Sequence, residues 1–266
     1  MASLGAAAVA AVARGPCCRH GARRVAFSLP CVMATRRGCN LVRRREFAAA
    51  SKEKEPRGVI DLGLGRVRAA LEAVGSPQAS LAGRVIHVAG TNGKGSVCAM
   101  VFSALRQSGV RVGFLASPHL VEPLDAVRMA EGGAEVLVDR ESWLQLQGEV
   151  LRACGLPDVA DAGSAGEFSE SGAAWLTSFE LQVVTTLVFF ARCQVDAVVL
   201  EVGLGGREDA TNVLDRPAAC VVTGIALDHE AWLGSTLDSI AYQKAGIFQR
   251  NCPALVASAA LAPSAR

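Results

Sequence analysis

Gly90-Thr91-Asn92-Gly93-Lys94-Gly95-Ser96 stands between an apolar run, Val85–Ala89, and a helix-like stretch at residues 97–107. A strand, a glycine-rich turn and a helix in this order are typical of a phosphate-binding loop. The glycines allow backbone N–H groups to turn toward an anion, and the start of the helix adds unpaired donors. We interpret the segment as a phosphate loop, with an ordinary glycine-rich turn as the alternative.

Lys94 is the residue that gives this loop its chemistry. Its cation can lie on the outer phosphates of a nucleotide, while a nearby hydroxyl reaches a magnesium ion. In the common form of the loop, lysine is followed directly by serine or threonine. Here Gly95 separates Lys94 from Ser96, so the generic pattern fits imperfectly.

Strand-like and helix-like segments alternate along the rest of the chain. Apolar runs at 110–115, 195–202 and 218–227 predict further strands. Helical spacing occurs at 66–74, 136–153, 178–193 and 236–248, and Ser178 is the expected N-cap of the third of these helices. The alternation predicts an α/β domain with a mostly parallel sheet flanked by helices. A Gly-, Ala-, Asp- and Ser-rich stretch at 155–172 is predicted to be a loop.

Polar residues follow several of these predicted strands. Ser117, Glu201 and His229 come at or just after strand ends, where an open parallel sheet binds its ligands. Each has a structural alternative: Ser117 as a turn cap, Glu201 in an ion pair with Arg207, and His229 as a turn histidine. Their convergence beside the phosphate loop predicts a magnesium–nucleotide site. Lys244 on the last helix would, taken alone, lie on a solvated face.

Composition bounds the class of protein. The chain has 266 residues, of which 51% are hydrophobic, enough for one sizeable α/β domain with appendages. Residues 1–45 contain nine arginines and no acidic residue, which predicts an organelle transit peptide, or alternatively a disordered N-terminus. Few hydroxyl residues favour the mitochondrion over the plastid, with the cytosol as a further alternative. Residues 46–58 are predicted to be a linker.

The remaining composition excludes several partners. Beyond the leader the chain is mildly acidic, so a nucleic-acid footprint is not indicated. No apolar run reaches the length that spans a membrane, and the five cysteines beyond the leader are scattered, with no paired metal-binding spacing. We expect a monomer that acts on small molecules.

The motifs together resemble the folylpolyglutamate synthase and dihydrofolate synthase family, which is related to the Mur ligases. In that family the glycine after the loop lysine is normal. The resemblance covers about residues 59–250 and is highly specific. It is carried by the loop and by the segments Asp61-Leu62-Gly63-Leu64, Ser117-Pro118-His119-Leu120, Leu200-Glu201-Val202-Gly203-Leu204-Gly205-Gly206-Arg207, Asp209-Ala210-Thr211-Asn212, Leu227-Asp228-His229 and Lys244-Ala245-Gly246-Ile247.

The resemblance implies a role for each matching residue. The loop residues Thr91, Asn92, Gly93, Lys94, Gly95 and Ser96 would bind ATP, and Ser117, Glu201 and His229 would bind magnesium. Lys94 and Lys244 would be catalytic, the second as a carbamylated lysine. The pterin substrate would contact Asp61, Leu62, Gly63 and Leu64, together with Thr177, Ser178, Phe179 and Glu180.

The implied reaction is ATP-driven ligation of L-glutamate to a carboxylate. The acid attacks the γ-phosphate to form an acyl phosphate, which the glutamate amine then attacks. Asn92 and Val97 look more like dihydrofolate synthase, which favours dihydropteroate over folate as the acceptor.

Two departures from the family leave alternatives open. An arginine expected after His119 is missing, since the matching stretch is Leu124-Asp125-Ala126. The family's C-terminal ligase domain is not expected here, because residues 251–266 are Ala-rich and unlike it. A non-catalytic nucleotide- or pterin-binding protein is therefore the second hypothesis, and an unrelated phosphate-loop NTPase is the third.

Overall fold

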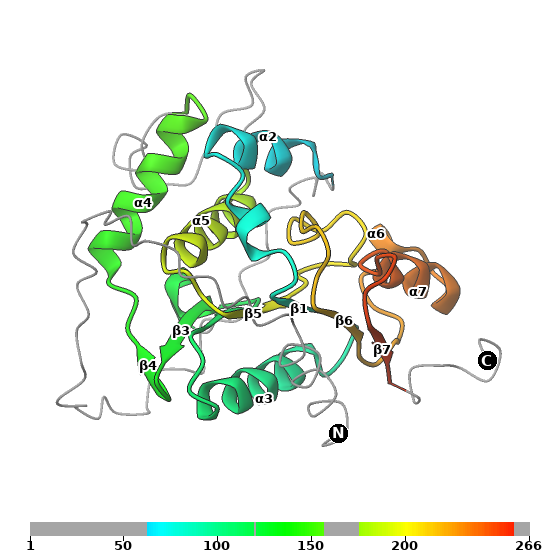
Figure 1. Cartoon of the computed structure of the whole chain (residues 1–266). Coiled ribbons are helices and arrows are strands. Elements are labelled where there is room, and N and C mark those ends of the chain that lie inside the picture. Colours follow the sequence, from blue (N-terminus) through cyan, green and yellow to red (C-terminus); the bar gives the residue numbers. More distant parts are fainter. Residues whose placement is uncertain (1–62, 120, 157–175, 258–266) are drawn as a thin grey trace, which may run out of the picture.

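The computed structural model describes residues 63–119, 121–156 and 176–257, which form one seven-stranded sheet with helices on both faces (Figure 1). The strands are β1 (Val85–Ala89), β2 (Val112–Leu115), β3 (Val127–Glu131), β4 (Ala134–Val136), β5 (Ala197–Glu201), β6 (Ala219–Val222) and β7 (Ala254–Val256). The α-helices are α2 (Gly65–Ala73), α3 (Lys94–Gln107), α4 (Arg140–Ala153), α5 (Ser178–Arg192), α6 (Glu230–Leu233) and α7 (Leu237–Ala245). Two 3₁₀ turns, η1 (Pro77–Leu81) and η2 (Pro123–Ala126), complete the set.

The strand order across the sheet is β4-β3-β2-β5-β1-β6-β7. The five strands from β2 to β7 in this order are parallel, whereas β3 pairs antiparallel with β2, and β4 pairs antiparallel with β3. The predicted mostly parallel sheet is confirmed. The β3–β4 hairpin at one edge was not predicted. At the other edge β7 extends the sheet past residue 250, where the sequence analysis placed the end of the domain.

Two apolar layers cover the sheet, one on each face. Helix α3 packs on one face, and α2, α4 and α5 pack on the other (Figure 1). Successive residues of β5 alternate between the layers: Val198 and Leu200 face the three-helix side, and Val199 faces α3. All five β5 residues are buried, as expected for a strand covered on both faces.

Several element boundaries differ from the predicted ones. Helix α3 begins at Lys94, three residues before the predicted start, so part of the phosphate loop lies in its first turn. The N-cap of α5 is Thr177 and not Ser178, because the Thr177 hydroxyl accepts the Glu180 amide while the Glu180 carboxylate accepts the Thr177 amide. Val136, the predicted start of a helix, is instead the last residue of β4, and α4 begins at Arg140.

Strand β6 ends at Val222, five residues before the predicted end at 227. The segment 223–226 leaves the sheet because it bonds to the phosphate loop, with Gly224 bridging Asn92. An apolar run alone does not distinguish a strand from such a connecting segment.

Some predictions fall outside the described residues. These are the transit peptide at 1–45, the linker at 46–58, most of the loop at 155–172, and the positions of Asp61 and Leu62. Among the described residues, none of the helices combines the length and apolarity needed to cross a membrane.

Candidate functional site

The phosphate loop connects β1 to α3 at the carboxyl edge of the sheet. Gly90 and Gly93 have φ values of +148° and +89°, which residues with a side chain rarely adopt. The first helical hydrogen bond runs from the Val97 amide to the Gly93 carbonyl, at 3.0 Å. The amides at the start of α3 therefore have no acceptor within the helix, which is the arrangement that binds an anion.

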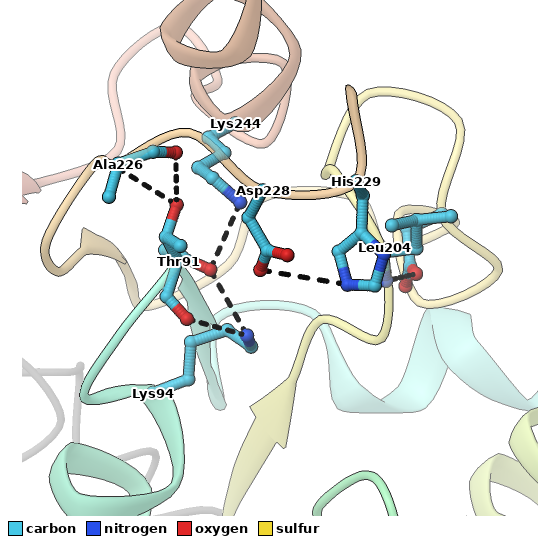
Figure 2. Close-up of polar contacts among 9 residues, drawn as sticks. Thr91, Lys94, Leu204, Ala226, Asp228, His229 and Lys244 are labelled. Atoms are coloured by element: carbon cyan, nitrogen blue, oxygen red, sulfur yellow. Dashed lines mark hydrogen bonds and ion pairs between the residues drawn. The ribbon is translucent and has the colours of Figure 1, made fainter. Parts of the chain in front are cut away.

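Two lysines converge on the carbonyl oxygen of Gly90. The Lys94 ammonium donates to it at 3.1 Å and the Lys244 ammonium at 3.0 Å (Figure 2). Lys244 is only 3% exposed, so it does not lie on a solvated face of α7. Burial, together with the nearby Lys94 charge, lowers the pKa of Lys244 to about 8, although Asp228 opposes the shift.

Glu201 is a buried carboxylate beside the same loop. It ends β5, is 4% exposed, and lies so close to α3 that a Cβ at Gly95 would be 3.6 Å from its Oε2 atom. Burial raises the pKa of Glu201, while the Lys94 charge and a backbone hydrogen bond from Ser117 lower it. No salt bridge joins Glu201 to Arg207 within the described part of the chain, and the Arg207 guanidinium lies 4.1 Å above the Tyr242 ring.

The three predicted metal ligands come from different segments, and Glu201 is the one that lies beside the phosphate loop. Ser117 follows β2, Glu201 ends β5, and His229 caps α6 with its side chain 50% exposed. The Nε2 atom of His229 is 3.6 Å from the Asp228 carboxylate (Figure 2). The described residues contain no group of three His, Cys, Asp or Glu side chains that could hold a metal ion. Magnesium commonly binds with one or two carboxylates plus substrate phosphates, and the buried Glu201 carboxylate fits that pattern.

The structure also brings together the two segments predicted to contact a pterin. Arg66 on α2 pairs with both carboxylate oxygens of Glu180 on α5, with Nε at 3.1 Å from Oε1 and from Oε2, and Nη2 at 2.9 Å from Oε1. The Phe179 ring packs against the backbone of Gly203, where a Cβ would lie 2.8 Å from it. Gly63 and Leu64 directly precede α2.

Sequence reasoning missed a buried polar chain beneath this site. His87 on β1 lies 2.8 Å from the Thr211 hydroxyl, which donates to the Asp209 carboxylate at 2.5 Å. Burial lowers the pKa of His87 to about 3, so its ring is neutral and donates from Nε2. Asp209 also accepts the Leu204 amide at 2.8 Å, which fastens the turn that follows Glu201. The Asp209–Asn212 motif was recognised, but residue types alone did not show that it points inward.

A surface cavity of about 490 Å³ lies elsewhere, between α2 and the segments 212–215 and 246–249. Its lining includes Arg68, Glu72, Asn212 and Gln249 and none of the predicted site residues. The converging polar groups, and not this cavity, therefore define the candidate site.

Known proteins share this arrangement of strands and helices. No family model matches the chain. The dihydrofolate synthetase of Saccharomyces cerevisiae is 40% identical over 196 residues, which are 73% of this chain and 41% of the relative. The dihydrofolate synthase/folylpolyglutamate synthase of Escherichia coli is 42% identical over 198 residues, 74% of this chain and 41% of the relative.

Solved structures agree with the sequence relatives. E. coli FolC in complex with DHPP and ADP superposes with a TM-score of 0.60 at 39% identity, covering 76% of this chain and 43% of that one. An FPGS–AMPPCP–folate complex gives a TM-score of 0.62 at 32% identity, covering 76% and 45%. The predicted resemblance and the predicted fold are thereby confirmed, and the chain spans about two-fifths of the length of the relatives it matches.

Proposed function

We propose, from the similarity of this chain to dihydrofolate synthase/folylpolyglutamate synthases, that it is the ATP-binding part of an acid–amino acid ligase of that type. The reaction joins L-glutamate to the carboxylate of dihydropteroate through an acyl phosphate, and folates are the second class of acceptor. One observation carries the proposal: Lys94, Lys244 and Glu201 converge on one phosphate loop at the carboxyl edge of a parallel sheet.

The loop residues have distinct tasks in this proposal. Amides at 93–96 bind the phosphates at the start of α3, and Lys94 leaves the Gly90 carbonyl to place its charge on the transferred phosphoryl group. Glu201, with Ser117 and His229, would hold a magnesium ion, which supplies charge neutralisation on the phosphate oxygens. The protein does little covalent chemistry and mainly positions the two reactants.

Dihydropteroate is the preferred acceptor for two reasons. Asn92 and Val97 resemble the dihydrofolate synthase form of the loop, and the yeast dihydrofolate synthetase is 40% identical, against 34% for the Arabidopsis thaliana folylpolyglutamate synthase.

The Arg66–Glu180 pair joins the two segments proposed to contact the pterin. It would keep α2 and the start of α5 at a constant separation around that ring system.

Lys244 is proposed to carry a carbamate. A neutral amine attacks CO₂, forms an N–C bond and releases a proton, so the reaction requires a lysine with a low pKa. Lys244, with a pKa of about 8, meets that requirement close to neutral pH. The resulting carboxylate-like group would replace a buried cation with oxygen ligands that suit magnesium.

We expect ¹³C-bicarbonate at pH 8 to give a carbamate signal by ¹³C NMR in the unchanged protein and none in Lys244→Ala. The signal should fall as the pH drops below about 8, because the amine becomes protonated. Without CO₂, stability should rise as the pH increases from about 8 toward the ordinary lysine value, since the folded state holds this proton less tightly than the unfolded state. Arg106→Ala is the control, because Arg106 lies in the last turn of α3 and pairs with Glu135. A signal that survives in Lys244→Ala would assign the carbamate elsewhere.

The decisive assay uses the purified chain with ATP, magnesium, L-glutamate and dihydropteroate. Formation of dihydrofolate, detected by mass spectrometry and dependent on all four, supports the ligase. Phosphate release without pterin or glutamate would instead indicate an unrelated NTPase.

A nucleotide- or pterin-binding protein without turnover is the second candidate. One observation favours it: the His229 side chain is 50% exposed, so the site is open to water on that side. An acyl phosphate in an open site would be exposed to hydrolysis. Saturable binding of ATP and dihydropteroate with no dihydrofolate formed would select this candidate.

A further inference from the structure

Thr223, the residue after β6, bonds both to the phosphate loop and to the end of β1. Its hydroxyl donates to the Asn92 carbonyl at 2.8 Å, with the Ala89 carbonyl farther away at 3.3 Å, and its amide donates to the Ala89 carbonyl at 2.9 Å. The residue is 5% exposed, so water does not compete freely for these groups. None of the roles inferred from the sequence involves Thr223.

The fit between Thr223 and the loop is close. A Cβ at Gly90 would lie 1.8 Å from the Thr223 hydroxyl oxygen, so this hydroxyl occupies the space that a side chain at Gly90 would need. The residues after Thr223 continue the attachment. The Thr91 amide donates to the Gly224 carbonyl at 2.6 Å, and the Thr91 hydroxyl donates to the Ala226 carbonyl and accepts the Ala226 amide, both at 3.1 Å (Figure 2).

A phosphate loop needs this kind of support for a simple reason. Its amides can face an anion only if the alternating carbonyls face away, and each buried carbonyl then requires its own donor. In this loop Lys94 and Lys244 donate hydrogen bonds to the Gly90 carbonyl, and the Thr223 hydroxyl donates one to the Asn92 carbonyl. The Asn92 carbonyl also accepts the Gly224 amide, but at a longer 3.3 Å.

We infer that Thr223 is a positioning residue for nucleotide binding: its hydroxyl holds the phosphate loop in the conformation that binds the triphosphate, without touching the ligand. The inference rests on the proposed function for the identity of that ligand. Because the segment from Thr223 continues to Asp228 and His229, the same attachment sets where those residues lie relative to the loop.

The test compares Thr223→Val, which keeps the shape and removes the hydroxyl, with Thr223→Ser, which keeps the hydroxyl. ATP affinity is measured by calorimetry with magnesium present, and stability by urea unfolding. We expect Thr223→Val to bind ATP about tenfold more weakly than the unchanged protein. The ATP affinity of Thr223→Ser should stay within about threefold of the unchanged value. Thr223→Ala is measured alongside, so that the result does not depend on one variant folding well.

Thr185→Val is the matched control. Thr185 is fully buried, and its hydroxyl donates to the Leu181 carbonyl at 2.7 Å inside α5. We expect Thr185→Val to lose about as much stability as Thr223→Val while keeping full ATP affinity. Equal weakening of ATP binding in this control, or unchanged binding in Thr223→Val, would overturn the inference.

Hydrogen exchange separates this inference from the proposed function. In the absence of nucleotide, Thr223→Val should speed amide exchange at residues 90–96, and Thr223→Ser should not. If the unchanged protein bound no ATP, the proposed function would fail while faster exchange at 90–96 still supported the attachment. Unchanged exchange in Thr223→Val would reject it.

Discussion

Lys94→Ala is expected to reduce nucleotide-dependent activity at least hundredfold while leaving the chain folded. Lys94 is the first residue of α3 and is half-buried. Among the described residues, its ammonium bonds only to loop carbonyls, those of Gly90 at 3.1 Å and Thr91 at 3.5 Å. Lys244 still donates to the Gly90 carbonyl in the variant, so the loop keeps a buried partner. The loss should therefore fall on the phosphates and not on the fold.

The measurement pairs ATP affinity and product formation with a thermal melt. Arg106→Ala is the control, because it removes a cation from the last turn of the same helix, where Arg106 bonds to Glu135 and not to the loop. We expect unchanged ATP affinity in the control. Undiminished turnover in Lys94→Ala would refute the role of Lys94, and loss of the cooperative melt would show that its role is structural.

Gly90→Ala is expected to lower the free energy of unfolding by about 3 kcal/mol or more and to abolish ATP binding. Two effects add at this position. A φ of +148° is strained for any residue with a Cβ, and that Cβ would lie 1.8 Å from the Thr223 hydroxyl oxygen. A backbone shift that relieved the strain or the contact with Thr223 would also move the Gly90 carbonyl away from Lys94 and Lys244, which donate to it.

Gly109→Ala separates strain from collision. Gly109 also has a positive φ, +81°, but no atom lies within 4 Å of the position of its Cβ. Its substitution should cost about 1 kcal/mol in urea unfolding and leave ATP binding intact. The double variant Gly90→Ala/Thr223→Ala should regain part of the lost stability and none of the binding, because the backbone strain remains. A Gly90→Ala protein as stable as Gly109→Ala would contradict the collision.

The strand, turn and helix around the phosphate loop were predictable because the residues that decide them are adjacent in the chain. Strand β1 was predicted with its observed bounds, and the burial of β5 with Glu201 at its end followed from a near-continuous apolar run at 195–202. The alternation of strands and helices was sufficient to predict a mostly parallel sheet, and the parallel arrangement in turn predicted which strand ends would meet. The ends of α3 and α5 were less certain, because neighbouring residues such as Thr177 and Ser178 cap a helix almost equally well.

Other features depended on contacts between distant residues. The pairing of β7 with β6, the attachment of Thr223 to the loop and the burial of Lys244 each join segments separated by more than thirty positions, and only folding shows which partner is near. Lys244 shows the difference most clearly: its place on α7 was read from the sequence, but its 3% exposure comes from the atoms packed around it. Burial, together with the Lys94 charge, then lowers its pKa. Residue order therefore determined the mostly parallel character of the sheet and its phosphate loop. Tertiary packing decided which polar side chains were enclosed there, because burial is a property of the surrounding atoms and not of the residue itself.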